Sequence, residues 1–349
     1  MKTNRLFFIA VLMTCLFQAC STDVDMLAEP KEITAIYGIL DYKQDTNFVK
    51  INKLICADDP ESYLSQHPSV SDFDGKLDVR LIEYVNGVRK REFSLDTITR
   101  ENKQPGIFSY PKQQLYYTTE RLLPNTSERK VSYELVVDTG EQTIVSTTDM
   151  VGDDEFRIIS PHLNFSKMYF GTVRAMKFVP AMNAGFFDVD IAFEYKERQI
   201  SSEDTATKVF HVIHSHMNRE DLAQSTQDGE FCIRYRPEHF FMSLGEYLGD
   251  DTLNHDVWRY ITDYPLIIRI DAGGWGMRDY LYLQELQQGA SLPNTDVSCV
   301  GHGAVGLFSS RTSITMRGRL AGETVPDLLS MNWGFRFIGG KNEELCESY

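Results

Sequence analysis

Apolar and polar residues alternate along much of the chain after residue 32, with the period of two that β-strands have. The clearest case is residues 187–195. In a strand with this pattern one face packs on a core and the other meets water, so we predict a half-buried antiparallel strand here. The predicted core side chains are Phe187, Val189, Ile191 and Phe193, and the predicted water-facing side chains are Asp188, Asp190 and Glu194.

Turn signals join several such segments in the first half. Asn86-Gly87 lies between two apolar-patterned runs, and this dipeptide favours a tight hairpin because both of its residues accept positive φ. A second hairpin is predicted through residues 138–140, and the strands 33–40 and 48–55 are expected to pair as antiparallel neighbours. Short strands at this spacing predict an immunoglobulin-like β-sandwich over residues 32–152.

Residues 153–349 are predicted to form a larger antiparallel β-rich domain with two or three short helices. Helices are expected at 237–248, ended by Gly249, and at 279–288. The glycine-rich runs 273–276 and 301–306 are interpreted as turns and bulges within a sheet. Further strands are predicted at 208–216, 266–271, 313–317 and 332–338. The expected fold class is therefore mainly β.

The first thirty residues carry a targeting pattern. Lys2 and Arg5 precede an apolar run too short to cross a bilayer, so residues 1–19 are predicted to be a signal peptide. Ala19-Cys20 resembles the end of a lipobox, where the cysteine receives a diacylglycerol before cleavage. We expect Cys20 to be lipidated and residues 20–31 to form an acidic tether.

Composition and charge exclude some classes of partner. The net charge of -15 and the lack of a Lys/Arg stripe argue against nucleic-acid binding, and they leave the acyl chains on Cys20 as the predicted membrane attachment. The remaining thiols outside the signal peptide lie far apart and lack any C-x-x-C motif, so their pairing stays open. They are Cys56, Cys232, Cys299 and Cys346.

The densest group of metal-ligating residues is His211-Val212-Ile213-His214-Ser215-His216. On a regular strand His214 and His216 share a face and His211 points to the other, so the cluster supplies two ligands where a closed zinc site needs more. His214 and His216 are therefore only weak metal candidates, and exposed strand histidines are the favoured interpretation. No cofactor and no catalytic residue is predicted, because the chain lacks a P-loop, a dinucleotide fingerprint, G-x-S-x-G and H-E-x-x-H.

Three classes of function stay open from the residues alone. The favoured one is a non-catalytic binding or accessory module, in which exposed aromatics such as Trp275 would contact a glycan or peptide ligand. A hydrolase with acidic and histidine residues assembled from separate strands is the alternative, and a fimbrial or adhesive subunit is the third.

Three segments carry a family resemblance: Tyr37-Gly38-Ile39-Leu40-Asp41, the run from Phe48 to Lys53, and the stretch from Asp279 to Gln284 leading to Gly303-Ala304-Val305-Gly306-Leu307-Phe308-Ser309-Ser310. They resemble uncharacterised Bacteroidetes outer-membrane lipoproteins with a domain of unknown function. The resemblance implies an N-terminal immunoglobulin-like β domain, an outer-membrane location and an outer-membrane partner such as a TonB-dependent transporter. In such lipoproteins an acidic segment after the lipidated cysteine resembles a signal for export to the cell surface, so we expect surface exposure.

Overall fold

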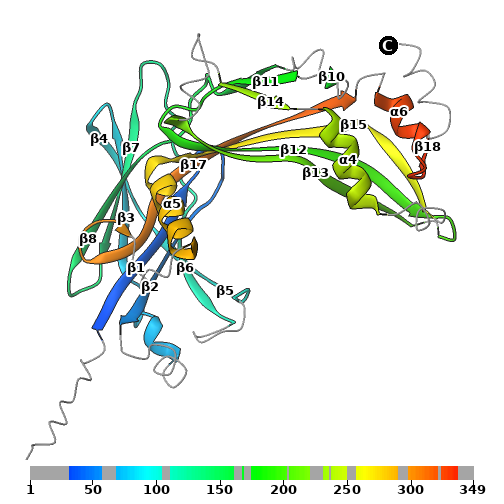
Figure 1. The fold of residues 1–349 in the computed structure, drawn as a ribbon. Coiled ribbons are helices and arrows are strands. Elements are labelled where there is room, and N and C mark those ends of the chain that lie inside the picture. Colours follow the sequence, from blue (N-terminus) through cyan, green and yellow to red (C-terminus); the bar gives the residue numbers. More distant parts are fainter. Residues whose placement is uncertain are drawn as a thin grey trace, which may run out of the picture.

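The protein is mainly β, as predicted, with three α-helices in the part of the chain that the computed structural model describes (Figure 1). The predicted signal peptide, Cys20 and the tether up to residue 30 lie outside it. The described residues are 31–56, 68–103, 111–160, 167–168, 174–202, 204–220, 231–235, 237–249, 257–289, 298–320 and 324–336.

Two sheets enclose a first core, which we call the N-terminal core. One sheet has the order β1 (Lys31–Leu40), β2 (Asn47–Cys56), β6 (Gln113–Thr118), β5 (Asp96–Arg100). The other has the order β4 (Val88–Ser94), β3 (Asp78–Val85), β7 (Val131–Asp138), β8 (Thr143–Asp149). A short 3-10 helix, η1 (Pro68–Ser71), precedes β3. All three strand pairs predicted in this half are confirmed.

The hairpin between β3 and β4 shows why its sequence signal is reliable. Asn86 and Gly87 have φ of 51° and 77°, the left-handed conformations that a tight two-residue turn needs. Alternate residues of the flanking strands then face the core, among them Val79, Leu81 and Phe93.

The long strands of the second half extend the first of these sheets. The order continues outward from β1 through β17 (Ala304–Leu320), β15 (Val257–Gly274) and β12 (Ala184–Gln199) to the edge strand β13 (Thr205–Asn218). Three short strands also pair onto this part: β10 (Lys167–Met168), β16 (Ser298–Cys299) and β18 (Phe335–Arg336). A separate small sheet has the order β14 (Phe231–Tyr235), β11 (Arg174–Val179), β9 (Arg157–Ser160).

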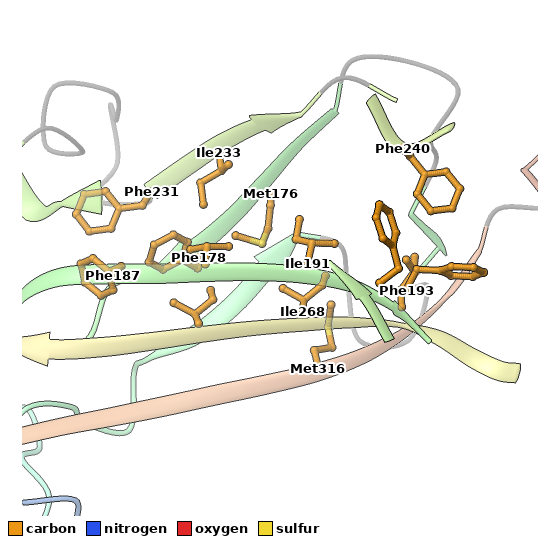
Figure 2. Packing of buried hydrophobic residues seen from close by; sticks show 14 of the residues in the cluster. Met176, Phe178, Phe187, Ile191, Phe193, Phe231, Ile233, Phe240, Ile268 and Met316 are labelled. Atoms are coloured by element: carbon orange, nitrogen blue, oxygen red, sulfur yellow. The ribbon is translucent and has the colours of Figure 1, made fainter. Parts of the chain in front are cut away.

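A second core fills the space between the long strands, the small sheet and helix α4 (Pro237–Leu248). Phe178 and Phe231 of the small sheet meet Phe187 of β12 with ring centroids 5.3–5.6 Å apart, and Phe240 of α4 packs edge-on against Phe193 at 5.4 Å (Figure 2). The alternation predicted for residues 187–195 is confirmed, because Phe187, Val189, Ile191 and Phe193 are all fully buried here.

Strand β17 belongs to both cores. Ala304 and Phe308 pack in the N-terminal core, whereas Met316 and Leu320 pack in the second. The first half of β17 pairs in parallel with β1, and its second half pairs antiparallel with β15. One continuous strand therefore joins the two units, and the N-terminal core draws residues from beyond the boundary predicted near residue 152.

The chain segment that connects the two cores is fixed by buried hydrogen bonds. The Asn125 side chain accepts from the Val131 N–H (2.8 Å) and donates to the carbonyls of Met150 (2.6 Å) and Gly152 (3.0 Å). The Ser310 hydroxyl accepts from the Val151 N–H at 2.9 Å and donates to the Asp149 carbonyl at 2.6 Å. The Ser310 bonds tie residues 149–151 to β17, and the Asn125 bonds tie residues 150–152 to the segment before β7.

The observed helix bounds agree only in part with those predicted from the sequence. Helix α4 has the predicted bounds and is followed by Gly249 at φ 76°. Helix α5 (Trp275–Gly289) begins four residues before its predicted start, and α6 (Thr324–Ser330) lies in neither of the two predicted helix ranges. Of the strand predicted at 332–338, only β18 is a strand, and residues from 337 lie outside the described part.

The interpretation of residues 273–276 as a turn or bulge is wrong. Strand β15 ends at Gly274 and α5 starts at Trp275, so this run is a direct strand-to-helix junction. Glycine is needed because neighbouring atoms come very close: a Cβ on Gly185 of β12 would lie 2.9 Å from the Trp275 Cα, and a Cβ on Gly274 would lie 2.9 Å from the Ser309 side-chain Oγ. In the run 301–306, a turn at 302–303 leads into β17, as predicted.

Candidate functional site

The long strands β13, β12, β15 and β17 bury one face in the second core and expose the other. We call the exposed side the open face. Arg269 and Arg317 have half of their side-chain surface in water, and His211 has 63%. The polar side chains of the open face include Asp188, Asp190, Glu194, His211, His214, His216, Arg269, Asp271, Ser313, Thr315 and Arg317.

The prediction that His211 points away from His214 and His216 is wrong. A β-bulge shifts the register between Ile191 and Ala192, so that Ile213 pairs with Ile191 while His211 pairs with Ala192. The one extra residue on β13 reverses the alternation, and His211 therefore joins His214 and His216 on the open face. A bulge leaves no reliable mark in a run such as His-Val-Ile-His, which is why the sequence did not indicate it.

Two of the three histidines are held by carboxylates of the neighbouring strand. His211 Nδ1 lies 2.8 Å from Asp190 Oδ1, and His216 Nδ1 lies 2.6 Å from Asp188 Oδ1. Because an ionised carboxylate only accepts hydrogen bonds, Nδ1–H is the donor in both pairs, and in the neutral ring Nε2 carries the free lone pair. The ring of His216 also lies 5.1 Å from that of Phe186, which is almost fully buried and fixes one side of the imidazole.

Such an imidazole can perform three kinds of chemistry through Nε2: accept a proton, bind a metal ion, or, when protonated, bind an anion. A serine nucleophile next to it would add hydrolysis to these. Ser215 is adjacent in sequence, but it pairs with Val189 and shares the core-facing side of β13. The histidine pairs therefore offer binding or proton exchange at the surface.

The arginines of the open face are paired with acids. Arg317 donates two hydrogen bonds to Glu194, at 2.9 and 3.1 Å, and these bonds raise the pKa of Arg317 and hold that of Glu194 below its ordinary value. Arg269 is bound to Asp271 through Nε at 2.7 Å and Nη2 at 2.8 Å, which raises the arginine pKa. Both pairs are fixed ionic groups on an exposed sheet, and each contributes little to stability.

Helix α5 lies in the corner between the open face and the N-terminal unit (Figure 1). Trp275, at its start, is 40% exposed, and the Arg278 guanidinium stacks 4.4 Å from its ring while donating to Glu220 at 3.0 Å. A shallow depression at this place is lined by Asn218, Glu220, Arg278, Asp279 and Tyr282. The exposure expected for Trp275 is therefore confirmed.

The metal candidates His214 and His216 lie on one face, as predicted. Within the described ranges, no group of three or more His, Cys, Asp or Glu side chains converges on a closed metal site. Among the cysteines, Cys232 is a free thiol, and Cys20 and Cys346 lie outside the described residues. No helix in the described part is long and apolar enough to span a membrane.

Comparison of the chain with protein-family models and with curated proteins gives no match. The arrangement of the open face is therefore the main guide to function.

Proposed function

We propose that this protein is a non-catalytic binding module of the outer membrane, anchored through lipid on Cys20 and exposed at the cell surface. The open face and helix α5 form its binding surface. Its partner is an outer-membrane protein complex, for which a TonB-dependent transporter is the candidate, and a peptide or glycan is the alternative ligand.

The observation that carries this proposal is the shape of the open face. It extends over four adjacent strands, exposes charged and histidine side chains, and meets α5 in the corner of the molecule (Figure 1). Small-molecule reaction sites enclose most of their substrate, whereas a broad exposed face with an exposed tryptophan stacked on an arginine at its margin suits a macromolecule.

The position of the first residue of β1 supports the proposed anchoring. Strand β1 begins at Lys31, at the end of the N-terminal unit that points away from the long strands (Figure 1). Ten residues lie between Cys20 and Lys31, so that the two can be at most about 40 Å apart when this segment is extended. With Cys20 in the membrane, the N-terminal unit is proximal and the open face stands clear of the lipid, where a partner can reach it.

We also propose that the N-terminal unit is immunoglobulin-like. The orders β1-β2-β6-β5 and β4-β3-β7-β8 correspond to strands A-B-E-D and C′-C-F-G of such sandwiches. The Tyr133 hydroxyl, near the start of the seventh strand, accepts from the Leu123 N–H at 2.9 Å. A tyrosine bonded to the backbone a few residues upstream at this place supports the same assignment.

Photo-crosslinking in intact cells tests the proposed function. A photoreactive amino acid replaces Val209, which is 40% exposed on the open face, and in a matched variant it replaces Met242, which is 63% exposed on α4. The proposal predicts an adduct with an outer-membrane protein or glycan at position 209 and none at position 242. It fails if position 209 gives no adduct, or if both positions give the same one.

A further inference from the structure

We propose that the open face binds a divalent transition-metal ion through Nε2 of His214 and His216. This inference rests on the proposed binding role of the open face and names a ligand for it. The juxtaposition that carries it is His214 on the same face of β13 as His216, whose ring is held by Asp188.

The spacing of the two imidazoles suits a shared ion. His214 and His216 are two residues apart on a regular stretch of β13, paired with Asp190 and Asp188 of β12. Side chains at this spacing lie on one face about 7 Å apart at their Cβ atoms. Two imidazole rings that lean together across this gap place both nitrogens about 2.0–2.1 Å from one ion.

The His216 ring is already oriented for this role. Its Nδ1–H is bound to Asp188 at 2.6 Å and its plane is set by Phe186, while 38% of its side chain remains exposed. A carboxylate on the far nitrogen is the usual outer partner of a metal-binding histidine, because it fixes the tautomer and strengthens the ligand nitrogen. Aspartate and phenylalanine thus prepare Nε2 of His216 to bind an ion before it arrives.

The surrounding charges favour a cation. Asp188 pairs with Asp271 across β12 and β15, and Asp190 pairs with Arg269, which is itself bound to Asp271. Imidazole nitrogens select copper, nickel and zinc over calcium or magnesium, with copper the tightest of these. Two protein ligands leave coordination positions open for water or for a donor group of the partner.

His211 provides an internal comparison. It shares the open face and has its own carboxylate, Asp190, but the bulge separates it from His214 by three residues instead of two. We assign the ion to the regular pair, so His211 is not a ligand.

The experiment uses the full-length chain in detergent, purified without a histidine tag and titrated with Cu²⁺, Ni²⁺ and Zn²⁺ against a chromophoric chelator. We expect one ion per chain, bound in the order copper above nickel and zinc. His214→Ala and His216→Ala should each weaken binding at least about tenfold, and Asp188→Ala about 10- to 100-fold. His211→Ala, and the exposed control His239→Ala on α4, should stay within about threefold, with unchanged circular dichroism in every variant.

The proposal is overturned if the wild type binds the ions no more tightly than the doubly substituted H214A/H216A chain. It is also overturned if His211→Ala weakens metal binding as much as His214→Ala does. Crosslinking at position 209 separates the two proposals. An adduct there without metal binding refutes the metal site and leaves the binding role standing, whereas metal binding without an adduct supports the site and removes the partner.

Discussion

Replacing Asn125 by alanine tests how the two cores are joined. Asn125 is fully buried and its side chain makes three hydrogen bonds to the backbone at residues 131, 150 and 152. Alanine leaves the buried Val131 N–H without an acceptor, which costs about 1–3 kcal/mol. The carbonyls of Met150 and Gly152 each keep another donor, from the Asn183 side chain and the residue 125 N–H, so their lost bonds cost about 0.5–1.5 kcal/mol each.

The expected loss is therefore about 4 kcal/mol of unfolding free energy. Urea unfolding followed by tryptophan fluorescence and circular dichroism measures it. With a slope of about 3 kcal/mol per M for a chain of this size, the midpoint should fall by roughly 1 M. Because β17 crosses both cores, both probes should report one transition in the wild type.

Asn125→Asp distinguishes the hydrogen bonds from simple packing. The ionised carboxylate keeps the bond from Val131 but faces the carbonyls of Met150 and Gly152 with like partial charge, so burial and these oxygens raise its folded pKa above the unfolded value. Its stability is then greatest in acid and is lost as the pH rises through the folded pKa. A loss below about 1 kcal/mol for N125A, or an N125D variant that does not lose stability relative to N125A between pH 5 and 8, would refute the reasoning.

Three further predictions concern single sites. In urea titration, Gly152→Ala should lower the free energy of unfolding more than Gly140→Ala does. Both glycines have positive φ, but only at Gly152 would a Cβ clash, because it would lie 2.8 Å from Thr312 Cγ2. Equal losses of unfolding free energy would contradict this. Tyr133→Phe removes the hydroxyl that bonds Glu83 at 2.7 Å and leaves the Leu123 N–H without its acceptor, and should cost about 1–3 kcal/mol in the same assay, an unchanged midpoint being the contrary result. Arg317 lowers the pKa of Glu194, so the stabilisation from this pair is present above the unfolded pKa of about 4.3 and is lost as the pH falls through the folded pKa. The difference in unfolding free energy between wild type and Glu194→Gln should therefore vanish in acid. A difference that is constant from pH 3 to 7 argues against the pair.

Local patterns predicted the strands well because each depends on neighbours in sequence. The alternation at 187–195 and the Asn86-Gly87 turn are examples, and α4 with Gly249 is another. The interpretation of the glycines at 273–276 went wrong because the side chains that come close to Gly273 and Gly274 belong to Phe186 and Ser309, which are distant in sequence.

The candidate site was harder to predict than the strands. Which histidines share a face depends on one extra residue at the bulge beside Ile191, and the pairing of His216 with Asp188 depends on strand register over 28 residues. The sharing of β17 between two cores likewise follows from its pairing with β1, more than 260 residues earlier in the chain. Neither the register of two strands nor their long-range pairing can be predicted from the local sequence.

The most direct test of the account is photo-crosslinking at Val209 on the open face, with Met242 on α4 as the matched position, in cells that carry the intact chain. The account predicts an adduct at position 209 with an outer-membrane partner that disappears when Trp275 and Arg278 are both replaced by alanine. An adduct found only at position 242, or one at position 209 that the double substitution leaves unchanged, would contradict the claim that the open face and α5 form one binding surface.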